Sequence, residues 1–391
     1  MKRIKELNTA FAEKFGPKTT QQFFAPGRIN LIGEHTDYNG GHVFPASITY
    51  GTYGVAAKRN DSKVFLYSMN FATEGVIQVD LDNLDYDPKH GWANYVKGMI
   101  KKLQEQGYYF DNGFDLLVQG NIPNGAGLSS SASLELLVGV MLEDLYQLEV
   151  NRLDLVETGQ KVENEYFGLH TGIMDQFAIG FGKEDEAILL DVNTMKHEMV
   201  PVVLGDYAIV IMNTNKRREL SDSKYNERRS ECEEALRRLQ AGGLEIDSLG
   251  QLTNAEFDEN QDLIQDEILI KRARHAVYEN QRTIDAKFEL SAGNLKAFGK
   301  LLDESHASLR DDYEVTGLEL DTLVSSAQAQ EGVLGARMTG AGFGGCAIAL
   351  VKESEITKFE NNVYDDYLKI VGYTPEFYVA HIGDGAMKLK D

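Results

Sequence analysis

Residues 26–41 read PGRINLIGEHTDYNGG, so a short apolar run passes directly into a dense set of charged and polar side chains. The run Ile29–Ile32 is typical of a buried strand, and the flanking glycines favour a sharp turn at its end. Polar groups delivered to a strand end lose hydration unless they are hydrogen-bonded. The block therefore predicts a site for a ligand rich in hydroxyls. Its polar members are Arg28, Glu34, His35, Asp37 and Asn39.

The chain has 391 residues, which exceeds one ordinary hydrophobic core and predicts two domains. We place the boundary near residue 200, giving domains 1–200 and 201–391, because the polar stretch Asp191–Glu198 precedes a fresh strand. Strands mixed irregularly with helices favour an α+β fold of packed layers over a regular doubly wound sheet.

Hydrophobic spacing predicts the individual elements, beginning with an amphipathic helix in residues 1–16. The expected strands are Val43–Ile48, Val64–Tyr67, Gly75–Val79, Phe114–Val118, Tyr207–Met212, Cys346–Val351 and Glu376–Ala380. The expected helices are Ser131–Leu148, Leu153–Phe167, Ser221–Leu239, Ile264–Thr283, Leu295–Ser308 and Glu355–Leu368.

The charge of the chain limits its partners, because 39 Lys and Arg stand against 61 Asp and Glu, a net charge of −22. Binding to nucleic acid or to an anionic membrane is disfavoured, since a basic face is the expected footprint. The two cysteines, Cys232 and Cys346, suggest neither a disulfide framework nor a zinc site. With no signal peptide and no apolar segment that could span a bilayer, we expect a protein of the reducing cytoplasm. We also expect a monomer.

A second block, residues 121–133, reads NIPNGAGLSSSAS and lies between an expected strand and an expected helix. Glycines allow close backbone approach, and the first N–H groups of a helix lack internal partners, so the block predicts an anion site. Its serine hydroxyls can add donors, and one can coordinate Mg²⁺. The block is neither a Walker A loop nor a G-x-S-x-G elbow. A serine-rich cap on a buried helix is the alternative.

A third block, residues 335–346, reads GARMTGAGFGGC. Gly340, Gly342 and Gly345 match G-x-G-x-x-G, but a strand follows where the dinucleotide motif requires a helix, so we reject that motif. A tight loop leading into a core strand and a ligand contact both stay open for this block.

In this order the three blocks resemble the GHMP family of small-molecule kinases, which pair a P-x-G-x-G-L-S-S-S-A loop with a C-terminal glycine-rich motif. The first block resembles the sugar-binding signature of the galactokinases within that family. The match runs from Phe24 to Gly345 and includes WANYVKG at 92–98 and HASLRDDY at 306–313.

This resemblance implies a fold and a reaction. The N-terminal domain would be like the second domain of ribosomal protein S5 and the C-terminal domain a ferredoxin-like α/β sandwich, with the active site between them. The implied reaction transfers the γ-phosphoryl group of ATP to the C1 hydroxyl of α-D-galactose, with Mg²⁺ as cofactor.

Two residues align with the catalytic pair of the family. Asp175, in the sequence GIMDQ, aligns with the base that accepts the proton of the anomeric hydroxyl. Arg28 aligns with the arginine beside that base, whose charge can offset charge that builds on the transferred group. The alternatives are a turn or cap role for Asp175 and a structural salt bridge for Arg28.

The resemblance also implies the sugar contacts, which need a mixture of donors and acceptors. They are Glu34, His35, Thr36, Asp37, Gly172, Asp175 and Tyr225. One alternative is a metal cluster of Glu34, His35, Asp37 and His42, although no helix-spaced ligand pair supports it. For Tyr225 the alternative is a solvated helix face, because the segment Lys216–Arg229 is charged.

The nucleotide contacts come from the same resemblance. Ser131 and Glu163 align with Mg²⁺ ligands, and Ser68 aligns with a contact near the adenine. The triphosphate would be held by Gly125, Ala126, Gly127, Leu128, Ser129, Ser130 and Ser131. An exposed helix glutamate is the alternative for Glu163. Rival functions are a kinase for N-acetylgalactosamine or arabinose and a non-catalytic galactose sensor.

Overall fold

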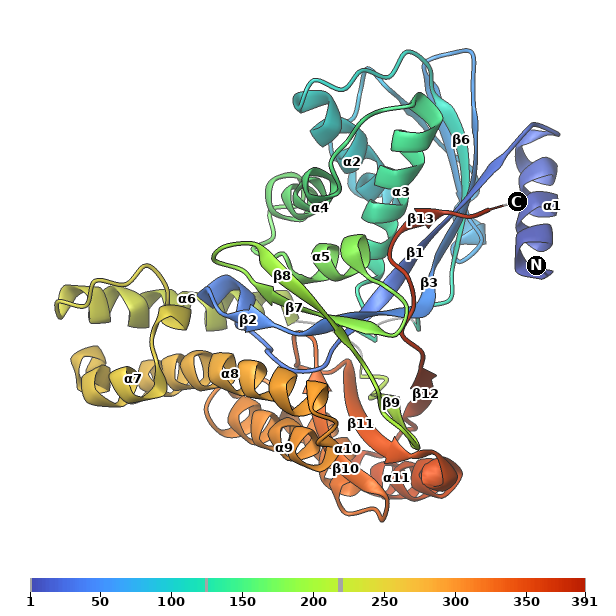
Figure 1. The fold of residues 1–391 in the computed structure, drawn as a ribbon. Coiled ribbons are helices and arrows are strands. Elements are labelled where there is room, and N and C mark those ends of the chain that lie inside the picture. Colours follow the sequence, from blue (N-terminus) through green and yellow to red (C-terminus); the bar gives the residue numbers. More distant parts are fainter. Residues whose placement is uncertain (1, 124–125, 217–220, 391) are drawn as a thin grey trace.

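The computed structural model describes residues 2–123, 126–216 and 221–390, and the chain forms two layered halves (Figure 1). The N-terminal half is built on a six-stranded sheet in the order β13-β1-β3-β6-β4-β5. All neighbouring strands are antiparallel except β4 and β6, which run parallel. The strands are β1 (Gln21–Asn30), β3 (Pro45–Lys58), β4 (Lys63–Ser68), β5 (Ile77–Asp80), β6 (Phe114–Gly120) and β13 (Met387–Lys388).

Helices cover both faces of this sheet. Side chains alternate between the faces of a strand, so Val55 of β3 packs with Leu7 and Phe11 of α1 (Lys2–Phe15) on one side, while Ala56 packs into the large core on the other. The helices of that second layer are α2 (Ala93–Glu105), α3 (Ser130–Tyr146), α4 (Arg152–Lys161) and α5 (Met174–Phe181). The second block, which we call the glycine-serine loop, leads directly into α3, and α3 is buried on almost every side, so its N-terminus is held firmly.

A three-stranded sheet follows, formed by β2 (His42–Val43), β7 (Glu186–Asp191) and β8 (Lys196–Pro201) in the order β2-β7-β8. The polar stretch Asp191–Glu198 forms the end of the β7–β8 hairpin and is not a linker. The domain boundary near residue 200 stays a prediction. It falls at the end of β8, while β13 returns the last strand of the chain to the N-terminal sheet.

The C-terminal half has an antiparallel sheet in the order β10-β11-β9-β12, packed against long helices (Figure 1). Its strands are β9 (Tyr207–Asn213), β10 (Val333–Thr339), β11 (Cys346–Lys352) and β12 (Glu376–Ala380). Its helices are α6 (Ser221–Ala241), α7 (Asn254–Asn260), α8 (Glu267–Ser291), α9 (Leu295–Asp311), α10 (Gly317–Gln328) and α11 (Ile356–Val371). The third glycine-rich block forms β10 and the loop before β11, and no helix opens there, so rejecting the dinucleotide motif is confirmed.

Most expected elements are present, and the bounds of two of them differ near the first block. The strand expected at Ile29–Ile32 is β1, which begins earlier and ends at Asn30, so Leu31 and Ile32 already belong to the loop. The strand expected at Val43–Ile48 is divided between β2 and β3. Hydrophobic spacing did not predict β7, β8, β10, β13, α2, α5, α7 and α10.

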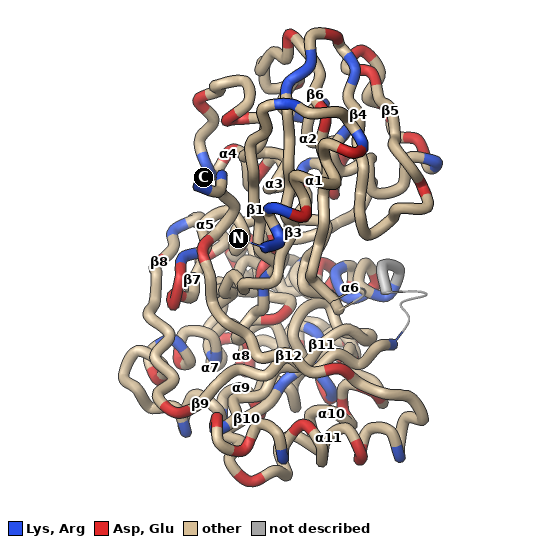
Figure 2. Tube along the Cα trace, turned by 90° about the vertical axis from the view of Figure 1, so that its right-hand side faces the viewer, with Lys and Arg blue, Asp and Glu red and all other residues tan. Residues whose placement is uncertain are grey.

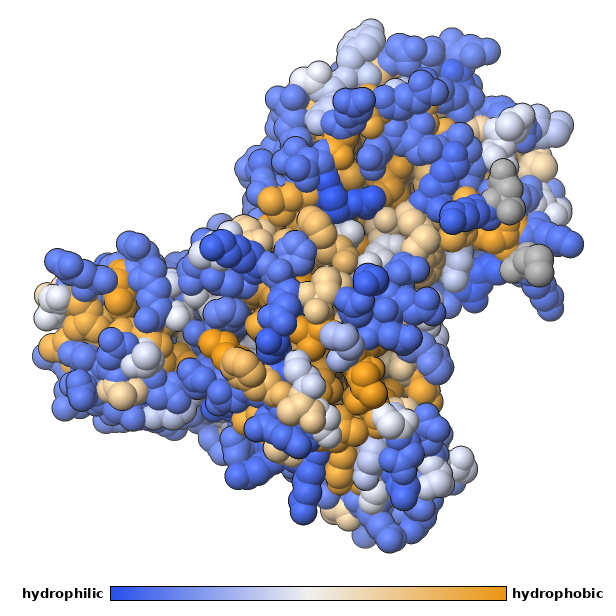
Figure 3. Space-filling view, viewed as in Figure 1, coloured by the Kyte–Doolittle hydropathy of each residue, from blue (hydrophilic) through white to orange (hydrophobic). Residues whose placement is uncertain are grey.

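The surface agrees with a strongly charged composition. In the view of Figure 2, lysines and arginines are interspersed with aspartates and glutamates over both halves. In Figure 3, hydrophilic residues cover most of the visible surface, and hydrophobic ones appear in patches between the halves, on the arm at the left and on the lower half. Among the described residues, none of the helices is both long and apolar enough to cross a membrane.

Candidate active site

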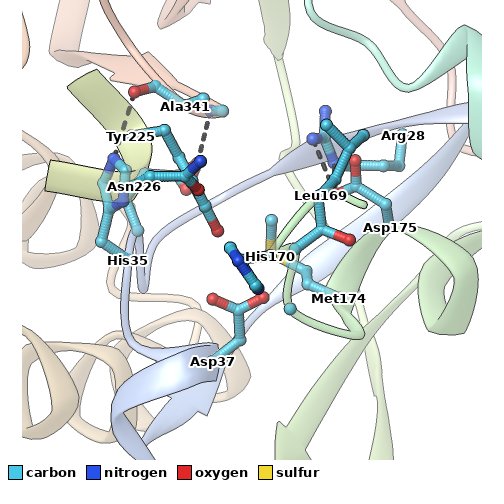
Figure 4. A pocket seen from close by; sticks show the side chains of 14 residues that line it. Arg28, His35, Asp37, Leu169, His170, Met174, Asp175, Tyr225, Asn226 and Ala341 are labelled. Atoms are coloured by element: carbon cyan, nitrogen blue, oxygen red, sulfur yellow. Dashed lines mark hydrogen bonds and ion pairs between the residues drawn. The ribbon is translucent and has the colours of Figure 1, made fainter. Parts of the chain in front are cut away.

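A pocket opens where the two halves meet, and both of them line it (Figure 4). The N-terminal half supplies the end of β1, the loop after it and the segment that leads into α5. The C-terminal half supplies α6 and the loop between β10 and β11. We call this the sugar pocket. Its lining residues are Arg28, Glu34, His35, Asp37, Leu169, His170, Thr171, Gly172, Met174, Asp175, Tyr225, Asn226, Gly340 and Ala341.

Arg28 and Asp175 form an ion pair at one side of this pocket. Nε and Nη2 of Arg28 lie 2.8 and 2.7 Å from Oδ1 of Asp175, and Nη1 donates to the Gly127 carbonyl at 2.7 Å. The Ser129 hydroxyl donates to Oδ2 of Asp175. Asp175 lies in the first turn of α5, where the helix dipole favours a negative charge. The salt bridge and a catalytic pair are therefore compatible, and the pair connects the pocket to the glycine-serine loop.

Glu34 is almost fully buried, and both of its carboxylate oxygens accept hydrogen bonds from other residues of the protein. Oε1 accepts from the N–H of Gly340 at 2.6 Å, and Oε2 accepts from Nδ2 of Asn30 at 2.6 Å. Burial raises the pKa of this carboxyl, and the Arg337 guanidinium opposes that rise. Each carboxylate oxygen has more than one acceptor direction, so Glu34 can still accept from a ligand hydroxyl.

His35 lines the pocket with its ring and has a left-handed backbone, with φ of 61°. Its Nε2 lies 3.2 Å from the Ala341 carbonyl and must donate, so Nδ1 accepts from the Tyr38 hydroxyl at 2.7 Å. Burial lowers the pKa of His35 to about 3, so the ring is neutral at pH 7. In this tautomer His35 connects the loop between β1 and β2 (residues 31–41), which we call the sugar loop, to the glycine-rich loop of the other half.

Thr36 and His42 do not line the pocket. The Thr36 hydroxyl lies 2.9 Å from the Gly33 carbonyl and 2.6 Å from the His42 carbonyl, so it stabilises the turn. The His42 ring contacts the Asn280 side chain at 2.9 Å. The metal-cluster alternative finds no support, because the described residues contain no group of three or more His, Cys, Asp or Glu that could hold a metal.

Asp37, Gly172 and Tyr225 form the opposite wall. Burial raises the pKa of Asp37 to about 6, and the charge of Asp175 adds to the rise. A Cβ atom on Gly172 would lie 1.7 Å from Oδ2 of Asp37, so a larger residue would displace this carboxylate. Tyr225 lies on the pocket side of α6 and not on a solvated face, and burial raises the pKa of its hydroxyl well above the usual value.

A second pocket lies within the N-terminal half, and we call it the nucleotide pocket. Ser68 at the end of β4 and Ser130 and Ser131 at the start of α3 line it. The remaining lining residues are Thr52, Asn70, Phe71, Trp92, Tyr95, Val118, Gly120, Ile122 and Leu134. Aromatic faces beside small polar groups suit a planar base.

The glycine-serine loop lies between the two pockets. Gly125 and Asn124 are outside the described residues, while Ala126 and Leu128 bury their side chains. Leu128 also accepts the backbone N–H of Arg28 at 3.2 Å. Because Ser129 contacts Asp175 and the next two serines line the nucleotide pocket, one short segment reaches both pockets.

Glu163 is not the exposed helix residue of the alternative interpretation. It is 6% exposed and lies in a π-helical turn, Val162–Tyr166, a feature that is frequent at functional sites. Ser131 donates to its Oε1 at 2.9 Å and Thr171 to its Oε2 at 2.7 Å. Burial raises the pKa of Glu163. A buried carboxylate beside a hydroxyl is an oxygen pair that fits Mg²⁺.

Reasoning from the sequence did not identify several residues of the site. Thr171 and Asn30 each hold a carboxylate, and Gly340 and Ala341 line the sugar pocket from the third block, for which a ligand contact had stayed open. Only the glycine pattern of that block pointed to them. Nothing local marks Thr171 or Asn30, since their importance comes from burial beside a carboxylate.

Comparison with known protein families identifies three matching domain models. Residues 9–58 match the galactokinase galactose-binding signature, residues 94–183 match the N-terminal domain of GHMP kinases, and residues 287–369 match the C-terminal domain of GHMP kinases. These ranges contain all three blocks, and they lie in both halves of the chain.

Curated relatives resemble the chain over almost its whole length. The galactokinase of Lactococcus lactis subsp. cremoris (strain MG1363) is 63% identical over 99% of this chain and 97% of its own length. The galactokinase of Streptococcus suis (strain 05ZYH33) is 58% identical over 98% of both chains.

Solved structures agree with these relatives. The crystal structure of Lactococcus lactis galactokinase complexed with galactose matches with a TM-score of 0.97 and 62% identity, covering 99% of this chain and all of that one. A mevalonate kinase structure, at 18% identity and a TM-score of 0.65 over 94% of this chain, shares the fold. The expected two-domain GHMP kinase fold is thus confirmed, and the chain belongs to the galactokinase family of the GHMP kinases.

Proposed function

We propose that this chain transfers the γ-phosphoryl group of ATP to the C1 hydroxyl of α-D-galactose, giving α-D-galactose 1-phosphate and ADP. The observation that carries the proposal is the placement of Asp175. Its carboxylate lines the sugar pocket and is bonded both to Arg28 and to Ser129 of the glycine-serine loop. A base at this point can reach a sugar hydroxyl while the loop holds a phosphate.

The sugar pocket supplies acceptors and donors for a ring of hydroxyls. Glu34 and Asp37 offer carboxylate oxygens, Tyr225 offers a hydroxyl, and neutral His35 keeps the loop in place. Gly172 leaves the space that Asp37 fills. Thr36 supports this set through the turn rather than through a ligand contact.

Asp175 accepts the proton of the anomeric hydroxyl as that oxygen attacks the γ-phosphorus. Proton removal is needed only late in a loose phosphoryl-transfer transition state, so an aspartate suffices. Arg28 holds Oδ1 of Asp175 and has its Nη1 on the Gly127 carbonyl, which places its charge where the transferred group gains negative charge.

The nucleotide would lie in the nucleotide pocket, with Ser68 near the base and residues Gly125 to Ser131 around the triphosphate. Free N–H groups at the start of α3 favour phosphate there. Ser131 and Glu163 would hold Mg²⁺, which neutralises phosphate charge during transfer. A cytoplasmic location, a monomeric state and an independence from nucleic acid and membranes stay predictions, as does the domain boundary near residue 200.

A substrate panel tests the proposal. Release of ADP is measured with ATP and, in turn, galactose, glucose, N-acetylgalactosamine and arabinose, with a sugar-free reaction as control. We expect galactose to have the highest kcat/KM. A higher value for another sugar would replace the proposed substrate, and binding of galactose without ADP release would make the chain a sensor.

A further inference from the structure

The buried arginine of the third block has no part in the function proposed so far. Arg337 lies on β10 with 0% of its surface exposed, in the C-terminal half. Its Nη1 donates to the carbonyls of Asn30 and Leu31 at 3.1 and 3.3 Å, so it reaches across to the strand end from which the sugar loop departs. Burying a guanidinium costs free energy unless the group is paired and hydrogen-bonded, so the contacts of Arg337 indicate its role.

Two buried carboxylates share this guanidinium. Nη2 of Arg337 lies 3.8 Å from Oε2 of Glu34 and 4.0 Å from Oε1 of Glu279, and it has no hydrogen-bond partner among the described residues. Glu279 has a second cation, because Nε of Arg282 lies 2.8 Å from its Oε2. For Glu34, Arg337 is the one cationic side chain within 4.0 Å in the part of the chain that the structure describes.

The same group of residues also fixes the backbone of the sugar loop. Oε1 of Glu279 accepts the N–H groups of Gly33 and Glu34 at 3.1 and 3.4 Å. Nε2 of His275 donates to the Glu34 carbonyl at 3.1 Å. The C-terminal half therefore holds Glu34 by its backbone and balances its charge.

We propose that Arg337 is a positioning residue for galactose recognition, which keeps the Glu34 carboxylate charged and aimed into the sugar pocket. This inference rests on the proposed function, because it assigns Glu34 to the sugar. Arg337 does not line the pocket, so it acts through Glu34 and touches neither substrate.

The charges around Glu34 favour this role. Arg28 on β1 also opposes the pKa rise that burial imposes on Glu34, but its contribution is smaller than that of Arg337, and its guanidinium is bound to Asp175. Asp37 and Glu279 are negative neighbours, and burial lowers the pKa of His275 to about 4, so it brings no charge at pH 7. Removing Arg337 would take away the main charge that compensates this buried carboxylate.

The test compares Arg337→Met, Glu34→Gln and the double variant by steady-state kinetics with galactose and ATP. We expect Arg337→Met to raise the galactose KM about tenfold, with kcat within about threefold and the ATP KM within about twofold. Glu34→Gln should raise the galactose KM by a similar factor. Because Arg337 is proposed to act through the charge of Glu34, the galactose KM of the double variant should not exceed the higher of the two single-variant values.

Arg272→Met is the matched control. Arg272 is another buried arginine of the C-terminal half, paired with Glu231 and Glu314 away from the sugar pocket. Its loss should lower the melting temperature and leave the galactose KM unchanged. A galactose KM that rises equally in Arg272→Met would reduce Arg337 to a general stabilising residue.

Two further outcomes would overturn the proposal: factors that multiply in the double variant, or an Arg337→Met variant with a low kcat and an unchanged galactose KM. If Arg337→Met does not fold, the double variant is compared with Glu34→Gln alone. Equal galactose KM values support the proposal, and a higher galactose KM in the double variant contradicts it, because Arg337 should add nothing to galactose binding once Glu34 is neutral. Failure of the wild-type protein to phosphorylate galactose would instead refute the proposed function.

Discussion

The two pockets are built in different ways. The sugar pocket takes its lining from both halves of the chain, from Arg28 to Ala341, whereas the described lining of the nucleotide pocket comes from residues 52–134 of the N-terminal half alone. The sugar pocket contains buried charges that are already bonded to protein groups. The nucleotide pocket presents aromatic rings and small polar groups, and one of its rings, Phe71, is 48% exposed.

This difference separates affinity for the sugar from affinity for the nucleotide. Carboxylates that are fixed before the ligand arrives lose little freedom on binding and can discriminate between hydroxyl patterns. A planar base stacked on aromatic rings needs less exact placement. Changes at the sugar pocket should therefore act on galactose and spare ATP, and the kinetic predictions below probe that separation.

The largest effect is expected at Asp175, which lines the sugar pocket and contacts the glycine-serine loop. Asp175→Ala removes the group that accepts the sugar proton, so kcat should fall by about a thousandfold or more. Galactose binding, measured by calorimetry, should stay within about tenfold, because Glu34 and Asp37 are unchanged. Turnover within tenfold of the parent would remove Asp175 from the role of base.

Gly172→Ala should act on the sugar pocket alone. Its new methyl group would collide with Asp37, which must move away from the pocket. We expect the galactose KM to rise by about ten- to a hundredfold and the ATP KM to change by less than about twofold. Equal increases in both values would show that the two pockets are not energetically separate.

Acidic pH should weaken sugar binding through Asp37. Its pKa of about 6 predicts that this carboxylate becomes protonated below pH 6, so the galactose KM should rise as the pH falls from 7.5 to 5.5. Kinetics of Asp37→Asn provide the comparison, since that variant should have a high KM with no step near pH 6. A step of the same size in the variant would assign the titration to another group.

The same carboxyl makes a prediction for stability, with the sign fixed by its raised pKa. A group that binds its proton more tightly in the folded state favours folding at low pH, and that contribution is lost as the pH rises through 6. Asp37→Asn should therefore melt several degrees higher than the parent at pH 8 and show little gain at pH 4. A stability gain at pH 4 that equals the gain at pH 8 would contradict this sign.

The smallest effect is expected at the edge of the nucleotide pocket. Ser68→Ala removes one hydroxyl near the proposed base site, so the ATP KM should rise by only about threefold while the galactose KM stays constant. Initial rates at varied ATP and saturating galactose measure it. An altered galactose KM would contradict the assignment of Ser68 as a contact to the nucleotide.

The sequence was most informative where function depends on consecutive residues. The turn that follows the first apolar run, the glycine-serine loop and the strand after Gly345 all follow from glycine placement and apolar runs, because these act over short distances. Their assembly into one site between two halves could be expected only from the resemblance to known kinases.

What the sequence could not provide are properties that depend on burial. A glutamate on a helical pattern is usually exposed, yet Glu163 is enclosed by a π-helical turn and by Thr171. Thr36 is a sequence neighbour of the expected sugar contacts, yet its hydroxyl contacts two backbone carbonyls of the turn instead of the pocket. Arg337 looks like an ordinary strand residue until the fold places it between two carboxylates.

The central claim is that Asp175 and the glycine-serine loop, which lies between the two pockets, bring the anomeric hydroxyl to the γ-phosphoryl group. The most direct test is ³¹P and ¹³C NMR of the product formed from galactose and ATP. We expect a single sugar phosphate in which phosphorus couples to C1 in the α configuration. A phosphate on C6 or another hydroxyl, or release of inorganic phosphate without a sugar phosphate, would contradict it.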